Sequence, residues 1–179
     1  MNADAPTAGF LDALLAPGPH TSLGAHAETY GRLIGSWAGG FEDRSADGQV
    51  ARGRMEVHFA WVLDGRAVQD VWIAPPRVER RAGQDGGSRD TYGSTLRVFD
   101  PEIEAWRVTW LNPVRGARNE LIGRRVGDDI EQTGWYRDAA IKWSFTRITR
   151  ESFVWQGFVL EADGTTWRLS TRFDLQRTR

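Results

Sequence analysis

The stretch LIGSWAGGFE (residues 33–42) places one tryptophan, Trp37, between Gly35 on one side and the pair Gly39 and Gly40 on the other. Upstream of this stretch the apolar residues recur with the spacing of a helix, whereas from Gly35 onward they alternate with polar residues. Such a change of period marks the point where a helical segment gives way to strands. The stretch therefore decides the fold class, which we expect to be all-β after a short helical beginning.

Ten antiparallel strands are predicted from this alternation and from the turn-forming residues between the strands. They span residues 36–43, 50–61, 66–73, 91–99, 104–111, 117–125, 129–136, 139–148, 151–161 and 165–176. Nearly every link is short enough for a hairpin, so the strands should follow one another as an up-and-down meander that closes into a lipocalin-like barrel.

One or two short helices should precede the barrel. The first is expected over residues 8–15, and the second begins at Ser22, whose side chain can cap a helix. Residues 1–30 then form a helical lead-in, and residues 31–179 form the barrel domain.

The composition excludes several classes of protein. The chain has 179 residues and a formal net charge of −1, which predicts one domain and argues against nucleic-acid binding. It contains no cysteine, which excludes disulfides, thiolate catalysis and cysteine-ligated zinc. Residues 1–20 lack both a basic segment and a long apolar run, so we expect no secretion signal, no membrane span and a cytoplasmic protein.

Successive links of a meander fall alternately at the two ends of a barrel. The tight links at 63–66, 100–102 and 127–128 share one end, whereas the longer links at 74–90 and 111–117 share the other. The end with the longer links is predicted to be an open mouth, and the opposite end a closed base. The polar, Gly-rich and Arg-rich stretch 74–90 is either an ordinary long loop or a lid over that mouth.

Aromatic and polar residues gather near the predicted mouth, in a chain that contains nine tryptophans. Aromatic walls with a few polar groups are typical of pockets for small molecules. The candidate ligand-binding residues are Trp72, Tyr92, Trp110, Asn112, Arg118, Trp135 and Trp143. The sequence thus predicts binding of a small hydrophobic or aromatic molecule.

A cofactor-independent enzyme, such as a cyclase, an isomerase or a lyase, is the alternative. It would use a carboxylate buried in the same cavity as general acid or base. Asp70 shares its strand face with Trp72 and points inward if that tryptophan does. Glu120 lies in one row with Arg118, and the two form either an inward pair or a solvated ion pair outside. His58 falls in the outward row of its strand.

No metal or cofactor is expected. The three histidines, at positions 20, 26 and 58, lack metal-ligand spacing, and phosphate-loop and serine-hydrolase motifs are missing. A homodimer whose exposed aromatic residues form the interface is a third possibility.

Gly35-Ser36-Trp37 resembles the Gly-x-Trp signature of the calycins. With the two following residues, the motif is most similar to the nitrobindin-like barrels and to lipocalin-like domains of unknown function. The strand layout extends the likeness over roughly residues 30–177. The resemblance implies a barrel of about ten strands with a cavity for a small, largely apolar ligand, and structural roles for Trp37 and Arg172.

Trp37 falls at the start of the first strand, hence at the predicted base, where Gly35 would let the backbone bend sharply. The last strand returns to this end and brings Arg172 and Arg177 within reach of a cation–π contact. The resemblance does not extend to haem, because nitrobindin-like proteins ligate iron through a histidine late in the chain. Here no histidine follows His58.

Overall fold

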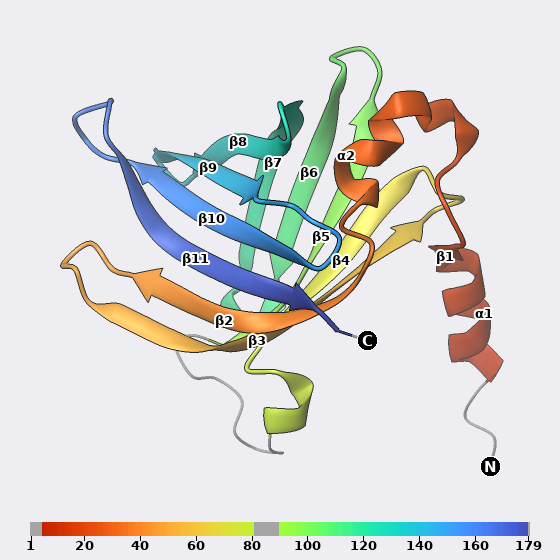
Figure 1. Ribbon diagram of the computed structural model, residues 1–179, viewed down its shortest axis with the longest axis horizontal. Helices are drawn as coiled ribbons and strands as arrows, with labels where there is room; N and C mark the ends of the chain where they lie inside the picture. The colour runs from red at the N-terminus through yellow and green to blue at the C-terminus, as the bar shows by residue number, and fades with distance from the viewer. Residues whose placement is uncertain (1–4, 81–89, 179) are drawn as a thin grey trace.

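The computed structural model describes residues 5–80 and 90–178, which form a closed antiparallel barrel (Figure 1). Its strands are β2 (Gly35–Arg44), β3 (Val50–Val62), β4 (Ala67–Ala74), β5 (Thr91–Asp100), β6 (Ala105–Asn112), β7 (Ala117–Val126), β8 (Asp129–Tyr136), β9 (Ala139–Thr146), β10 (Ser152–Leu160) and β11 (Trp167–Arg177). The ten-stranded, all-β prediction is confirmed, and each predicted strand end lies within two residues of the observed one.

The barrel closes by sequential pairing. Each strand from β2 to β11 pairs with its neighbour in sequence, and β11 returns to β2, with Arg177 opposite Trp37. A two-residue strand, β1 (Leu15–Ala16), adds to the end of β3 outside this ring. The connectivity is the predicted up-and-down meander.

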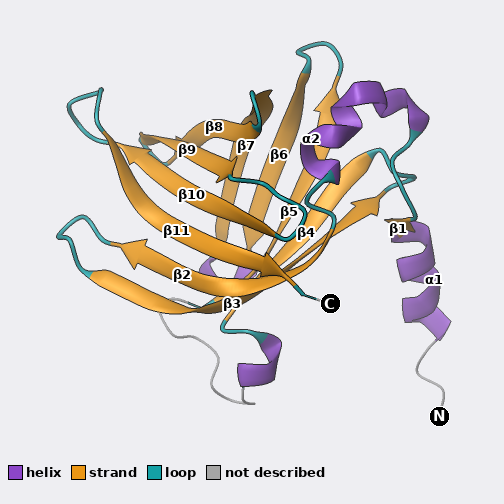
Figure 2. Cartoon of the chain, in the orientation of Figure 1, coloured by secondary structure: helices purple, strands orange, loops and turns teal. Residues whose placement is uncertain are grey.

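The segment before the barrel contains α1 (Ala5–Leu14), the 3₁₀ turn η1 (Thr21–His26) and α2 (Ala27–Gly31). Ser22 was expected to cap a helix, but it lies inside η1 and does not. Its backbone N–H donates to Nδ1 of His20, at 3.1 Å, so His20 is the cap of η1. Figure 2 shows that strands form the wall, while α2 lies at one end of it. Among the described residues, no helix is long and apolar enough to cross a membrane.

Trp37 lies at the end of the barrel that α2 covers, where it is fully buried. Its indole N–H donates to the Leu33 carbonyl at 2.8 Å, and the Arg177 guanidinium lies 4.0 Å from its ring centroid. Arg177 also donates to the carbonyl of Ile34, at 2.7 Å. Gly35 has φ +128°, and a Cβ there would lie 2.3 Å from Nη1 of Arg177. The base is therefore closed by a stacked cation that needs a glycine beside it.

Of the two arginines expected within reach of Trp37, Arg177 contacts it and Arg172 does not. The Arg172 guanidinium instead binds Asp174 through two hydrogen bonds, of 2.8 and 2.7 Å. These bonds raise the pKa of Arg172 above its ordinary value. The reason is parity: Arg172 and Arg177 are five positions apart, so they lie on opposite faces of β11 and only Arg177 faces inward.

Candidate functional site

The barrel holds a cavity of about 400 Å³ that extends toward the strand ends at Asp43, Asn112 and Tyr136. This is the end where the sequence predicts the mouth, away from α2. The volume lies within the range of about 300–1,000 Å³ that is typical of small-molecule pockets. Side chains from nearly every strand of the wall contribute, so the cavity belongs to the barrel as a whole.

One wall of the cavity is a continuous series of aromatic rings. Trp155 stacks on Phe173 at 4.7 Å between centroids, and its other neighbour, Trp143, lies 5.6 Å away. Trp143 meets Trp110 edge-on at 6.5 Å. Trp72 lies 5.3 Å from Phe173 and completes the series. Offset and edge-on ring pairs of this kind stabilise one another and leave flat apolar surface toward the cavity.

Gly93 makes room for one of these rings. A Cβ at this position would lie 2.3 Å from Cη2 of Trp110 and 2.7 Å from the Leu111 carbonyl oxygen. Because the indole occupies the space that a side chain on β5 would fill, the identity of residue 93 sets where Trp110 stands.

The floor of the cavity carries a buried ion pair. Nη1 of Arg97 lies 2.6 Å from Oδ2 of Asp70, and the two side chains are 2% and 0% exposed. The other carboxylate oxygen, Oδ1, accepts a hydrogen bond from the Thr95 backbone N–H, at 2.8 Å. Arg97 and Thr95 line the cavity, whereas Asp70 lies behind them. The Asp70 carboxylate thus balances the charge of Arg97, which is the one buried arginine among the residues that the structure describes.

Beneath the ion pair a small polar network continues toward the base. The Gln132 side-chain oxygen accepts from the Tyr30 hydroxyl at 3.1 Å and from Nε of Arg97 at 3.3 Å. The Arg97 guanidinium also lies 4.9 Å from the Tyr30 ring centroid. Burial raises the pKa of Tyr30 above its ordinary value, so the phenol stays neutral.

Two asparagines face the cavity without a partner. Asn112 at the end of β6 is 4% exposed, and Asn119 on β7 is 6% exposed. Within the described residues neither carboxamide makes a hydrogen bond, and Oδ1 of Asn112 is fully buried. Buried polar atoms without partners are rare, because burial without a hydrogen bond is unfavourable.

The seven residues predicted to bind ligand divide into four that face the cavity and an outward group of three. Trp72, Trp110, Asn112 and Trp143 line the cavity. Tyr92, Arg118 and Trp135 lie outside it, and their predicted place in the cavity is wrong. Glu120, the candidate acid or base, lies outside as well, in the solvated ion pair with Arg118 that was one of its two expected arrangements.

The outward group is explained by strand parity. Asn119 and Leu121 form the inward row of β7, so Arg118 and Glu120 form an ion pair on the outer surface, with side chains 67% and 65% exposed. Trp135, near the end of β8, is 67% exposed in a shallow outer groove. Tyr92 follows the same rule, because its neighbour Gly93 faces inward.

Arg97, Trp155 and Asn119 are cavity residues that the sequence analysis did not select. The signal for Arg97 lay in Asp70: an inward carboxylate requires a cation nearby, and Asp70 is opposite Thr95 in the register of β4 and β5. Arg97 shares the inward face with Thr95, two positions along the strand.

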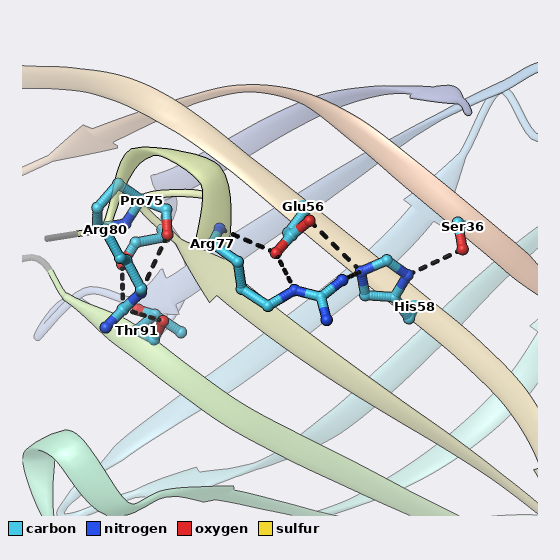
Figure 3. A network of polar contacts seen from close by, with 8 residues as sticks. Ser36, Glu56, His58, Pro75, Arg77, Arg80 and Thr91 are labelled. Carbon is cyan, nitrogen blue, oxygen red and sulfur yellow. Dashed lines mark hydrogen bonds and ion pairs between the residues drawn. The ribbon is translucent and has the colours of Figure 1, made fainter. Parts of the chain in front are cut away.

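A second polar network lies on the outer surface of the barrel (Figure 3). His58 points outward as predicted, and its Nε2 accepts from Nη2 of Arg77, at 3.1 Å. Since a guanidinium only donates, the His58 proton lies on Nδ1 and is donated to Ser36 Oγ, at 2.9 Å. Ser36 is therefore an acceptor and is not activated as a nucleophile, although Glu56 stands 3.5 Å from the imidazole.

Arg77 ties the segment after β4 to the barrel wall. Its Nε and its backbone N–H both donate to Oε1 of Glu56, at 2.6 and 3.0 Å. Burial raises the pKa of Glu56, but these hydrogen bonds outweigh it and hold the pKa below its ordinary value. The predicted loop or lid at 74–90 lies in large part outside the described residues, which end at Arg80 and resume at Asp90.

No protein-family profile matches the sequence, and no curated protein matches it. Among solved structures, the chain is similar to the S-type phycobiliprotein lyase CPES from Guillardia theta, with 15% identity and a TM-score of 0.56 over 85% of this chain and 92% of that one. It is also similar to Rv2717c from M. tuberculosis, with 20% identity and a TM-score of 0.57 over 92% and 99% of the two chains. At these identities the likeness shows the fold alone, which is a calycin-like barrel.

Proposed function

We propose that the protein binds a small, largely aromatic molecule in the barrel cavity. The observation that carries this proposal is the wall formed by Trp72, Trp110, Trp143, Trp155 and Phe173 beside a cavity of about 400 Å³. Flat apolar surface of this kind gains most free energy by stacking on another ring system, because both surfaces lose water and keep offset ring contacts.

The charges at the floor of the cavity favour an uncharged ring system there, whereas Asp43 and Arg115 line the cavity nearer its mouth. Arg97 is already balanced by Asp70 at 2.6 Å, so the floor offers no net charge to a ligand. An ionised ligand placed there would be desolvated without a counter-ion, which is unfavourable by several kcal/mol. We therefore expect neutral ring systems to bind more tightly than their ionised analogues.

Binding is supported better than catalysis by the positions of the two candidate carboxylates. Glu120 lies on the outer surface, and Asp70 is held by Arg97 and by the Thr95 backbone. Neither carboxylate is positioned to exchange a proton with a ligand in the cavity. The likeness to a chain described as a phycobiliprotein lyase supports a small-molecule role for a barrel of this shape.

The proposal agrees with the resemblance to the nitrobindin-like barrels, which implies a cavity for a small, largely apolar ligand. It does not include haem, since the chain offers no histidine after His58.

The test is an equilibrium titration with N-phenyl-1-naphthylamine, a neutral aromatic probe whose fluorescence rises in apolar surroundings. Ala117 lines the cavity, whereas its neighbour Arg118 points outward, so Ala117→Phe and Arg118→Phe add the same ring on opposite sides of β7. If the added ring takes away about 60 Å² of probe contact, affinity falls by about 1.5 kcal/mol, or about tenfold. We expect this loss in Ala117→Phe and wild-type affinity in Arg118→Phe; equal affinities in all three proteins would overturn the proposal.

A further inference from the structure

Asn112 and Asn119 are buried polar groups for which the protein itself supplies no partner. They lie 4% and 6% exposed on the cavity wall, and neither carboxamide makes a hydrogen bond within the described residues. By contrast, Asp70 and Gln132 at the floor each bond to neighbouring residues of the barrel through a side-chain oxygen, although Nε2 of Gln132 has no partner among the described residues. The two asparagines therefore present unused donors and acceptors to whatever occupies the cavity.

The two carboxamides lie beside one aromatic ring. Across β6 and β7, Trp110 is opposite Asn119, and Asn112 is opposite Ala117, so all three inward side chains occupy the same part of the wall. Direct cross-strand neighbours have Cβ atoms about 4.5–5.5 Å apart, and diagonal neighbours about 7–8 Å. A planar ligand that stacks in the aromatic wall at Trp110 can thus bring its edge to Asn112.

The chemistry of that edge follows from the carboxamide. A carboxamide presents a carbonyl oxygen and an N–H side by side, and the complement is an N–H beside a C=O on the ligand. Oδ1 of Asn112 is buried in the wall, so the carboxamide must turn toward the cavity to form both hydrogen bonds. The edge is complementary whichever way the carboxamide turns, and it carries no charge. It therefore also meets the requirement set by the balanced pair of Arg97 and Asp70.

We propose that the buried part of the ligand is an uncharged planar heterocycle with an amide edge, an N–H beside a C=O, which hydrogen-bonds to Asn112 and stacks in the aromatic wall. This inference deepens the proposed function and rests on it. Two parallel hydrogen bonds in a site shielded from water should favour such a ring over the same ring without the edge by about five- to tenfold.

Three probes of similar size test the inference by calorimetric titration: 2-quinolinone, which has the edge; N-methyl-2-quinolinone, in which the donor is blocked; and naphthalene, which has neither group. Wild-type protein is expected to bind 2-quinolinone about five- to tenfold more tightly than the other two. In Asn112→Leu, which keeps similar volume without polar atoms, this preference should disappear. Thr109→Leu, on the outer face of the same strand, is the matched control and should keep it.

The outcomes separate the inference from the proposed function. If N-phenyl-1-naphthylamine binds but 2-quinolinone has no advantage in wild-type protein, the inference is overturned and the proposed function stands. If Asn112→Leu keeps the preference, the inference is overturned as well. If neither N-phenyl-1-naphthylamine nor 2-quinolinone binds, both are overturned. The comparison of probes in wild-type protein does not depend on the folding of any variant.

Discussion

Replacement of Asp70 by asparagine removes the charge that balances Arg97 while keeping the size of the side chain. The two groups lie 2.6 Å apart and are 2% and 0% exposed, so water cannot replace the lost carboxylate. A guanidinium left buried without its partner costs about 3–5 kcal/mol. Since domains are stable by only about 5–15 kcal/mol, Asp70→Asn should lose a large part of its free energy of unfolding.

Chemical denaturation followed by tryptophan fluorescence measures this loss. The matched control is Asp174→Asn, which breaks the outer pair with Arg172, whose side chains are 56% and 29% exposed. That change should cost no more than about 1 kcal/mol. The double variant Asp70→Asn/Arg97→Met should regain most of the stability, because no charge is then buried. A loss in Asp70→Asn as small as that of the control would refute the reasoning.

Three other changes test separate parts of the structure. Arg177→Ala should lower the free energy of unfolding by about 2–4 kcal/mol, through the lost stacking and carbonyl bonds, and Arg172→Ala by less than about 1 kcal/mol; equal losses in denaturation would contradict the account of base closure. Gly93→Ala should lower the free energy of unfolding by about 1–3 kcal/mol and weaken probe binding, because the new methyl displaces the Trp110 indole. At Gly40 a Cβ would meet only an ordinary contact at 3.6 Å, so Gly40→Ala is expected to resemble wild type. Similar losses of stability in both variants would count against this packing. Burial raises the pKa of Tyr30 above the unfolded value of 10.0, so stability should be full below pH 10 and fall above it as the unfolded chain releases the proton; an alkaline denaturation series should show a shallower fall for Tyr30→Phe, and an identical slope would argue against a buried neutral phenol.

The barrel was predictable because its signals are local. Alternation marks each strand and a short turn marks each hairpin, and neither depends on residues far away in the sequence. The assignment of the mouth followed from the same turns, since the links of a meander alternate between the two ends. The cap of η1 is His20 and not Ser22, two residues further on; the sequence pattern favours Ser22 because serine is the commoner cap residue.

Side-chain orientation limited the prediction of the site. Trp135 was selected for its place near the mouth, but position along a strand says nothing about which face a side chain occupies. Arg97 was missed for a related reason: a charged residue in a strand usually faces water, and its burial here depends on Asp70 in the neighbouring strand. In β11, the odd spacing from Arg172 to Arg177 shows that only one of the two can face the core. The sequence does not say which one does.

A crystal structure of the protein with N-phenyl-1-naphthylamine tests the central claim most directly. We expect electron density for one probe inside the barrel, stacked against Trp110, Trp143 or Trp155. A probe found only in the outer groove beside Trp135 and Trp167, with the interior unchanged, would contradict this claim.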